Sequence, residues 1–93
     1  AEGATLAFGG GVPKMQGFEG GCYVEPTIFT GVTDGMTIAQ EEIFGPVLST
    51  ITFNDVEEAV AIANDTKYGL AAQLYTNNLH IAHKVSRAIR AGT

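Results

Sequence analysis

The strongest constraint on the fold is the alternation of two apolar periodicities over residues 47–92. Segments 47–53 and 70–76 are short apolar runs typical of strands, and each is followed by a stretch with helical spacing of its apolar residues. The first helix is expected to begin at Asn54 or Asp55 and the second at Asn77 or Asn78, because these side chains can cap a helix. Strand, helix, strand, helix is the order of βαβ units on a parallel sheet. This predicts an α/β fold, although two or three strands do not complete such a sheet.

The same periodicity predicts a core. In the strand over 47–53, Ile51 and Phe53 are the surest core residues. Segment 64–69 is expected to be a loop, and Gly92 suits the position beyond the last helix. The two helices each carry an apolar face, formed by Val56, Ala59, Val60 and Ala63 in the first and by Ile81, Ala82, Val85 and Ile89 in the second.

The first half of the chain predicts shorter elements. Residues 5–8 read as a strand, and the glycines over 9–21 indicate a loop. Segment 22–30 is rich in β-branched and aromatic residues, but Pro26 lacks an N–H, so this is an edge strand or a broken one. Thr37 and Gln40 have capping-box spacing, which predicts a helix over 38–42 that Gly45-Pro46 stops. No internal repeat or domain boundary is visible, and residues 1–93 are expected to belong to one domain.

Charge and composition exclude several classes of protein. The formal net charge is −5, with 5 Lys and Arg against 10 Asp and Glu, so a nucleic-acid partner is not expected. No apolar stretch is long enough for a membrane span, and no signal peptide is visible. Cys22 is the single cysteine, which fits a reducing compartment, and we expect a cytoplasmic protein. The start at Ala1 without methionine and the stop just after a helix read as cuts in a longer protein.

Four segments resemble the aldehyde dehydrogenase superfamily, in its order and at its spacing. The longest is Met36-Thr37-Ile38-Ala39-Gln40-Glu41-Glu42-Ile43-Phe44-Gly45-Pro46-Val47. The others are Gly-Cys-Tyr-Val-Glu-Pro-Thr over 21–27, Ala-Asn-Asp-Thr-Lys-Tyr-Gly-Leu-Ala-Ala over 63–72 and Arg-Ala-Gly-Thr over 90–93. The resemblance covers essentially the whole chain. It implies a fragment of the C-terminal part of an aldehyde dehydrogenase catalytic domain, with partial parallel-sheet α/β architecture.

The resemblance implies a cofactor role for two residues. In that family, the glutamate in the place of Glu42 binds the ribose of the nicotinamide half of NAD or NADP. A carboxylate has two acceptor oxygens and can take hydrogen bonds from both vicinal ribose hydroxyls. The phenylalanine in the place of Phe44 lies beside the nicotinamide. Read without the family, Glu41 and Glu42 are a solvated helix end and Phe44 is a core residue.

The resemblance also implies an activity for the parent protein. The family oxidises an aldehyde substrate to the carboxylic acid through a cysteine nucleophile and a general-base glutamate. The motifs that carry those two residues are absent, so the isolated chain is expected to be inactive. We expect a homo-oligomeric parent. An alternative is a stand-alone, non-catalytic α/β module that binds a nucleotide or a protein, and the chain made alone is expected to self-associate through uncovered strand edges and apolar faces.

Other chemical signals are weaker. Cys22 lies in no nucleophile motif of the family and is interpreted as a partly buried or incidental thiol. The glycines at 9–11 do not open a helix, so they are no phosphate loop. His80 and His83 could share a metal but lack further ligands nearby, so surface histidines are expected. Asp55, Glu57 and Glu58 are expected to stabilise a helix N-terminus, with Lys84, Arg87 and Arg90 toward the C-terminal end of the last helix.

Overall fold

The computed structural model of the chain describes residues 2–13, 16–18 and 20–93. It divides into two compact units, Ala1–Thr52 and Phe53–Thr93. Each unit is described by itself below. The assignment of residues 1–93 to one domain stays a prediction.

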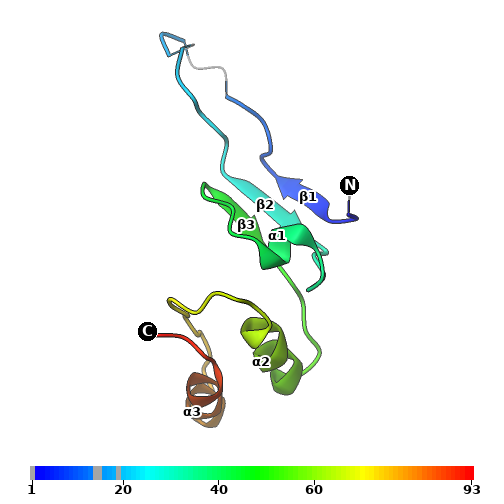
Figure 1. Ribbon diagram of the computed structural model, residues 1–93, viewed down its shortest axis with the longest axis vertical. Helices are drawn as coiled ribbons and strands as arrows, with labels where there is room; N and C mark the ends of the chain where they lie inside the picture. The colour runs from blue at the N-terminus through cyan, green and yellow to red at the C-terminus, as the bar shows by residue number, and fades with distance from the viewer. Residues whose placement is uncertain (1, 14–15, 19) are drawn as a thin grey trace. The chain divides into compact units, whose positions relative to one another are not determined.

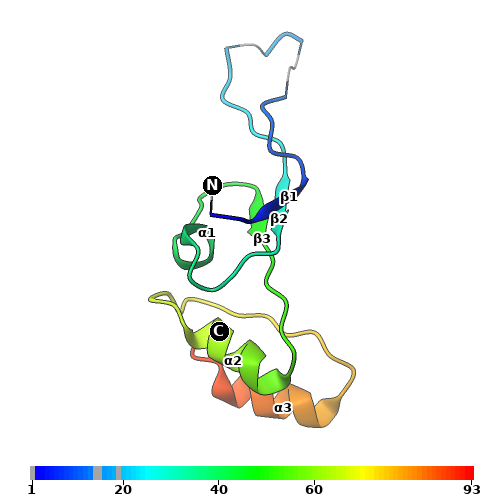
Figure 2. The same ribbon diagram turned by 90° about the vertical axis from the view of Figure 1, so that its right-hand side faces the viewer.

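The first unit holds a three-stranded sheet in the order β1-β2-β3. Its strands are β1 (Thr5–Phe8), β2 (Thr27–Thr30) and β3 (Val47–Ser49). β1 and β2 are antiparallel, whereas β2 and β3 are parallel, with Thr27 opposite Val47. The single-turn helix α1 (Thr37–Gln40) connects the two parallel strands and lies on one face of the sheet (Figures 1 and 2). The sheet is therefore mixed, and its βαβ unit is formed by the first half of the chain, not by the second.

Two of the strands are shorter than the sequence predicts. The strand expected over 22–30 begins only at Thr27, directly after Pro26, and it is the central strand of the sheet. The interpretation as a broken strand is thus correct and that as an edge strand is wrong. The strand expected over 47–53 ends at Ser49. Phe53, predicted as core, is 57% exposed, while Ile51 is partly buried.

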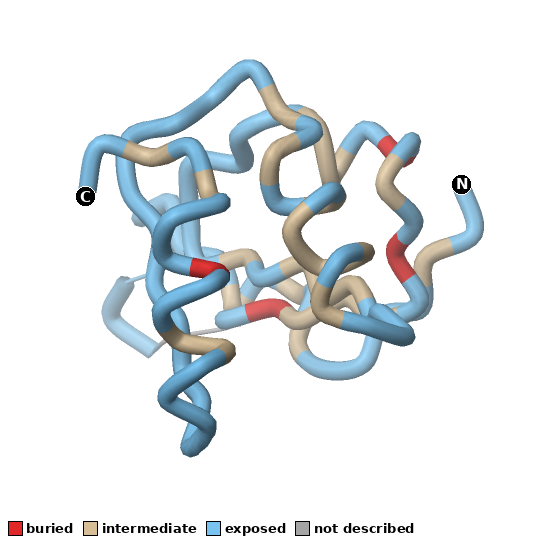
Figure 3. The backbone as a smooth tube through the Cα atoms, turned by 90° about the horizontal axis from the view of Figure 1, so that it is seen from below, coloured by how far each residue is buried: buried red, intermediate tan, exposed pale blue. Residues whose placement is uncertain are grey.

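Few residues of the first unit are in the buried class (Figure 3). Val32 and Met36, on the connection between β2 and α1, form its apolar core together with the buried Thr27. The Thr27 hydroxyl donates to the Glu25 backbone oxygen at 2.8 Å and accepts from the Gly10 N–H at 3.0 Å. Burial of this hydroxyl therefore leaves no unmet hydrogen bond.

Helix α1 is not capped as the sequence predicts. Its N-cap residue is Met36, which provides no side-chain cap, and the helix spans 37–40 and not 38–42. The N–H of Thr37 instead donates to Glu2 Oε1 at 3.1 Å. The Gln40 side chain reaches Asp34 and not the N-cap backbone, so the capping-box prediction is wrong.

The second unit contains two helices that pack against each other, α2 (Val56–Asn64) and α3 (Leu79–Ala88). Both caps are as predicted, since Asp55 Oδ1 accepts from the Glu58 N–H at 2.7 Å and Asn78 Oδ1 accepts from the Ile81 N–H at 3.1 Å. On the predicted apolar faces, Val85 is buried and most of the others are partly buried, but Ala63 is exposed.

The strand predicted over 70–76 does not form. Leu70 and Tyr75 are 88% and 87% exposed, and the structure assigns no strand to these residues. Backbone hydrogen bonds join this stretch to the last residues, from the Gly92 N–H to Gly69 O at 2.9 Å and from the Ala72 N–H to Thr93 O at 2.8 Å. A strand requires a ladder of such bonds along a neighbouring strand, so the apolar run over 70–76 is not sufficient by itself to form one.

Candidate functional site

The candidate site is the connection between α1 and β3, which carries both residues that the sequence singles out. The helix ends at Gln40, and the Glu41 N–H donates to Thr37 O at 2.8 Å. Glu41 has extended backbone angles, φ −106° and ψ 143°, so the chain leaves the helix there. The helix therefore ends five residues before Gly45, earlier than the proline was expected to stop it.

The other end of this connection is attached to the sheet. The Thr27 N–H at the start of β2 donates to Pro46 O at 2.8 Å, and the Val47 N–H donates to Gly45 O at 2.8 Å. The second bond closes a three-residue turn around Pro46, whose ring restricts φ to the range that such a turn needs. The connection is therefore held by backbone hydrogen bonds where it joins β3.

Between these two ends, the side chains point away from any core. Glu42 is exposed, and Ile43 and Phe44 are exposed by 41% and 97%. The interpretation of Phe44 as a core residue is wrong for the described structure. Burying a phenylalanine ring contributes about 1.5–3 kcal/mol, and Phe44 gains none of this within its own unit.

This segment offers two chemical groups close together in sequence, a hydrogen-bond acceptor at Glu42 and an apolar ring at Phe44. The Glu42 carboxylate offers two oxygens to hydroxyl donors, and the Phe44 ring offers an open face to a planar or apolar group. Glu41 is also exposed, as the interpretation of a solvated helix end requires. The exposure of Glu42 fits both that interpretation and the cofactor role.

Hydrogen bonds that the sequence did not predict support α1. Gln40 Nε2 donates to the Asp34 backbone oxygen at 2.7 Å and to Asp34 Oδ1 at 3.2 Å. Hydrogen bonding to Thr37, at the other end of the helix, lowers the pKa of Glu2. Glu2 and Thr37 are 35 positions apart, and no sequence pattern pairs residues at that distance.

The hollows of the two units lie elsewhere. In the first unit, a hollow of about 200 Å³ is lined by Glu2, Ala4, Phe29, Met36 and Ile38. In the second, a hollow of about 250 Å³ is lined by Leu74, Val85, Ile89 and their neighbours. Neither of these two hollows is lined by Glu42 or Phe44, which lie on an exposed segment of the described chain.

The remaining candidates of the sequence are surface residues. Cys22 is a free, exposed thiol, so of the two interpretations that of a partly buried thiol is wrong, and that of an incidental thiol stays a prediction. His80 and His83 are both exposed on α3. In the part of the chain that the structure describes, no helix is long and apolar enough to cross a membrane.

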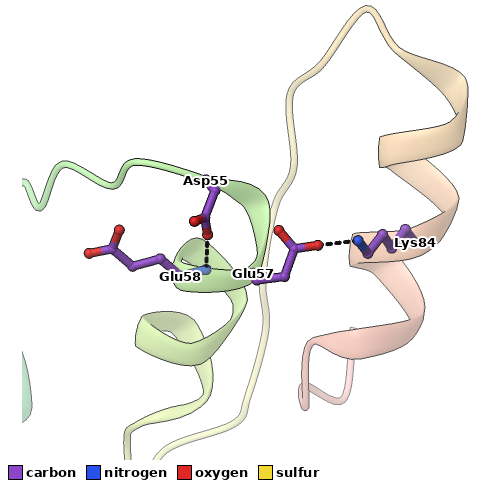
Figure 4. A network of polar contacts seen from close by, with 4 residues as sticks. All are labelled: Asp55, Glu57, Glu58 and Lys84. Carbon is purple, nitrogen blue, oxygen red and sulfur yellow. Dashed lines mark hydrogen bonds and ion pairs between the residues drawn. The ribbon is translucent and has the colours of Figure 1, made fainter.

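The acidic cluster at the start of α2 is structural, as predicted. Asp55 caps the helix, and Glu57 forms an ion pair with Lys84 of α3 (Figure 4). The hydrogen bond from Lys84 is the main cause of a lowered pKa for Glu57. Glu58 accepts from the Asn54 N–H at 2.9 Å.

Comparison with known proteins identifies the family. The sequence model of the aldehyde dehydrogenase family matches residues 1–93. Betaine aldehyde dehydrogenase of Brucella anthropi is 61% identical over 93 residues, which are 100% of this chain and 19% of that protein. The chain thus spans about a fifth of the length of the curated relatives it matches.

Solved structures share the fold as well as the sequence. Indole-3-acetaldehyde dehydrogenase in complex with NAD+ is 59% identical with a TM-score of 0.91, and the match covers 98% of this chain and 18% of that one. The structure of 3,6-anhydro-L-galactose dehydrogenase in complex with NADP is 44% identical with a TM-score of 0.90, covering 98% of this chain and 19% of that one. The match along the whole sequence, together with this agreement in structure, shows that the chain belongs to the aldehyde dehydrogenase family.

Proposed function

We propose that this chain is part of an NAD(P)-dependent aldehyde dehydrogenase that oxidises an aldehyde to the carboxylic acid. We call that longer protein the parent enzyme. Within it, Glu42 and Phe44 contact the nicotinamide half of the cofactor, and the nucleophilic cysteine and general-base glutamate are supplied by other parts of the chain. Similar solved structures carry NAD+ or NADP, which supports a nicotinamide dinucleotide as the cofactor.

The observation that carries this proposal is the exposure of Glu42 and Phe44 on one short segment with fixed ends. Phe44 is 97% exposed, and a group that covered its ring would gain the roughly 1.5–3 kcal/mol that burial of such a side chain contributes. A nicotinamide ring is planar and fits such a face. The Glu42 carboxylate would accept hydrogen bonds from the two hydroxyls of the adjoining ribose, so the residues present fit the group that the family implies.

These two residues bind and orient; they do not react. The nicotinamide, when bound, supplies the hydride acceptor. Glu42 holds the sugar, and Phe44 restricts where the attached ring can lie. Correct placement of reacting groups accounts for a large part of enzymatic acceleration, and a misplacement of about 1 Å can cost on the order of 10²-fold in rate.

Substitution of Glu42 in the parent enzyme tests the proposal. Glu42→Gln keeps the size of the side chain but loses the charge and one acceptor, so we expect a rise in KM for the cofactor and a fall of about 10-fold or more in kcat. The matched control is Glu41→Gln, the same change at the neighbouring exposed position, which should leave both constants within about 2-fold. Unchanged steady-state kinetics in Glu42→Gln would overturn the assignment.

A titration of the isolated chain separates this proposal from that of a stand-alone binding module. We expect no saturable NAD+ binding below millimolar concentration, because two exposed side chains provide few of the contacts that offset the cost of association. Saturable binding at micromolar NAD+ would favour the module.

A further inference from the structure

The side chain of Gln40 connects the end of α1 to the turn that precedes the helix. Its Nε2 donates to the Asp34 backbone oxygen at 2.7 Å and to Asp34 Oδ1 at 3.2 Å. Both residues are partly buried, so water competes less for these bonds than it would at an open surface. We call this pair of contacts the Gln40–Asp34 clasp.

The clasp is fixed to the core of the first unit. Val32 and Met36, on either side of Asp34, are 4% and 8% exposed. The Met36 N–H also donates to Thr33 O at 3.0 Å, which closes the turn around Asp34. Gln40 therefore attaches the last residue of the helix to a stretch of backbone that packing already holds in place.

Helix α1 needs such an attachment. It has only four residues and no side-chain cap of its own. A single helical turn is unstable by itself, because nucleation fixes several backbone dihedrals for one hydrogen bond. The direction in which the chain leaves the helix is therefore set by contacts outside the helical backbone, and the clasp is one such contact at the end where the chain leaves.

The residues that follow directly are those of the candidate site. Glu42 is two positions after Gln40, and it has no buried neighbours on its own segment, since Ile43 and Phe44 are both exposed. Downstream, the segment is fixed again where the Thr27 N–H donates to Pro46 O at 2.8 Å. The position of Glu42 thus depends on the two ends of the connection.

We propose that Gln40, through its clasp on Asp34, is a positioning residue that sets where Glu42 and Phe44 meet the nicotinamide half of the cofactor. This inference rests on the proposed function of those two residues. Gln40 itself does not touch the cofactor in this proposal. Its side-chain amide is the required group, because the clasp uses its donor hydrogens and Asp34 supplies acceptors only.

The test uses the parent enzyme with Gln40→Met, which keeps the length of the side chain and removes the donor. We expect NAD+ to bind about 10-fold more weakly, the factor that corresponds to one hydrogen bond of ordinary strength. The affinity for ADP, which lacks the nicotinamide and its ribose, should stay within about 2-fold of that of the unsubstituted enzyme. General damage to the fold would instead lower the affinity for both ligands alike. The matched control is Gln73→Met, which loses the hydrogen bond from the Tyr75 hydroxyl at 2.8 Å in the other unit and should leave both affinities unchanged.

A double substitution distinguishes this proposal from the one on which it rests. If Gln40 acts through Glu42 and Phe44, the loss of NAD+ affinity in the variant carrying Gln40→Met and Glu42→Gln should be smaller than the sum of the losses in the two single variants. Additive losses would overturn the positioning role. Normal NAD+ binding in Gln40→Met, with impaired binding in Glu42→Gln, would overturn it as well while leaving the proposed function standing. Normal binding and kinetics in Glu42→Gln would overturn the proposed role of Glu42 on which this inference rests.

Two further variants keep the test decisive. Asp34→Asn retains the backbone oxygen and a side-chain acceptor, so the clasp persists and NAD+ affinity should stay within about 2-fold of that of the unsubstituted enzyme. If Gln40→Met does not yield folded enzyme, Gln40→Glu removes the amide donor at the same size and should show the same selective loss of NAD+ over ADP. Equal affinity of Gln40→Glu and the unsubstituted enzyme for NAD+ would overturn the proposal.

Discussion

The side-chain oxygen of Asn64 accepts a hydrogen bond from the backbone N–H of Arg90 at 2.8 Å. Its side-chain nitrogen donates to Ala88 O at 2.9 Å, and the Arg90 guanidinium donates to the Asn64 backbone oxygen at 2.9 Å. One residue at the end of α2 thus satisfies a backbone carbonyl at the end of α3, where the helix leaves such groups without intrahelical partners. Asn64 is the principal polar link between the C-terminal ends of the two helices.

Replacement of Asn64 by alanine is expected to loosen the end of α3. Both side-chain bonds are lost, which we expect to cost about 1–2 kcal/mol of local stability. The measurement is amide hydrogen exchange of residues 86–92 in the parent enzyme, which should become faster. The control is Asn77→Ala, at the exposed neighbour of the Asn78 cap, and it should leave exchange at these residues unchanged. Unaltered exchange in Asn64→Ala would contradict the linking role.

Gly9 is expected to tolerate no side chain. Its φ is +72°, and a Cβ at this position would lie 1.9 Å from the backbone oxygen of Pro26. The strain and the clash together should cost about 3 kcal/mol or more in Gly9→Ala, because backbone atoms on both sides must move. Gly35→Ala is the matched control, since a Cβ there meets nothing within 4 Å, and its effect should stay within about 0.5 kcal/mol. Urea unfolding of the parent enzyme compares the two variants. Equal unfolding midpoints would contradict the close approach of Gly9 to the Pro26 backbone.

The ion pair of Glu57 with Lys84 is expected to contribute a pH-dependent stabilisation. Hydrogen bonding to Lys84 lowers the pKa of Glu57 from its ordinary value of 4.5. A carboxyl with a lowered pKa in the folded state stabilises the fold above its unfolded pKa, and this contribution is lost as the pH falls through the folded pKa. The stabilisation is therefore complete at neutral pH and disappears in acid below 4.5.

Thermal unfolding of the parent enzyme with Glu57→Gln checks this prediction. At pH 7, the variant should unfold at a slightly lower temperature than the unsubstituted enzyme, and the difference should shrink as the pH is lowered to 4. It should also shrink with added salt, because exposed charges are screened. A difference that is constant with pH would show that Glu57 acts through packing and not through its charge.

The isolated chain is expected to self-associate. Leu70, Tyr75 and Leu79 are 88%, 87% and 73% exposed, and large apolar side chains left uncovered in this way favour association. Sedimentation velocity should show oligomers or aggregates at micromolar concentration, and Leu70→Ser with Tyr75→Ser should reduce them. A monodisperse, cooperatively unfolding monomer would contradict this prediction.

Local sequence signals predicted the helices of the second unit well. Asp55 and Asn78 were among the expected caps, and both accept a hydrogen bond from an N–H three residues further on. Such an interaction is complete within one turn of chain, so residue type and spacing are enough to predict it. The strand over 70–76 failed for the opposite reason, because a strand needs a partner that a single segment does not contain.

The candidate site was predicted in part. Glu42 and Phe44 came from the resemblance of one segment to a family, and their contact with the cofactor remains a prediction. The structure shows that Phe44 is exposed and not part of a core. The bond between Gln40 and Asp34 was not predicted, since the spacing of Thr37 and Gln40 favoured a capping box that does not form.

The sequence by itself determined the family, through four ordered segments that cover the chain, and it determined the helices α2 and α3, through caps and periodicity. Only the tertiary structure decided that the sheet is mixed, that Phe53 is exposed, and that Glu2 holds the start of α1 from 35 positions away. The physical reason is the range of the interactions. Caps and helical periodicity act over three or four residues, whereas sheet pairing, burial and long-range hydrogen bonds depend on which distant segments come together.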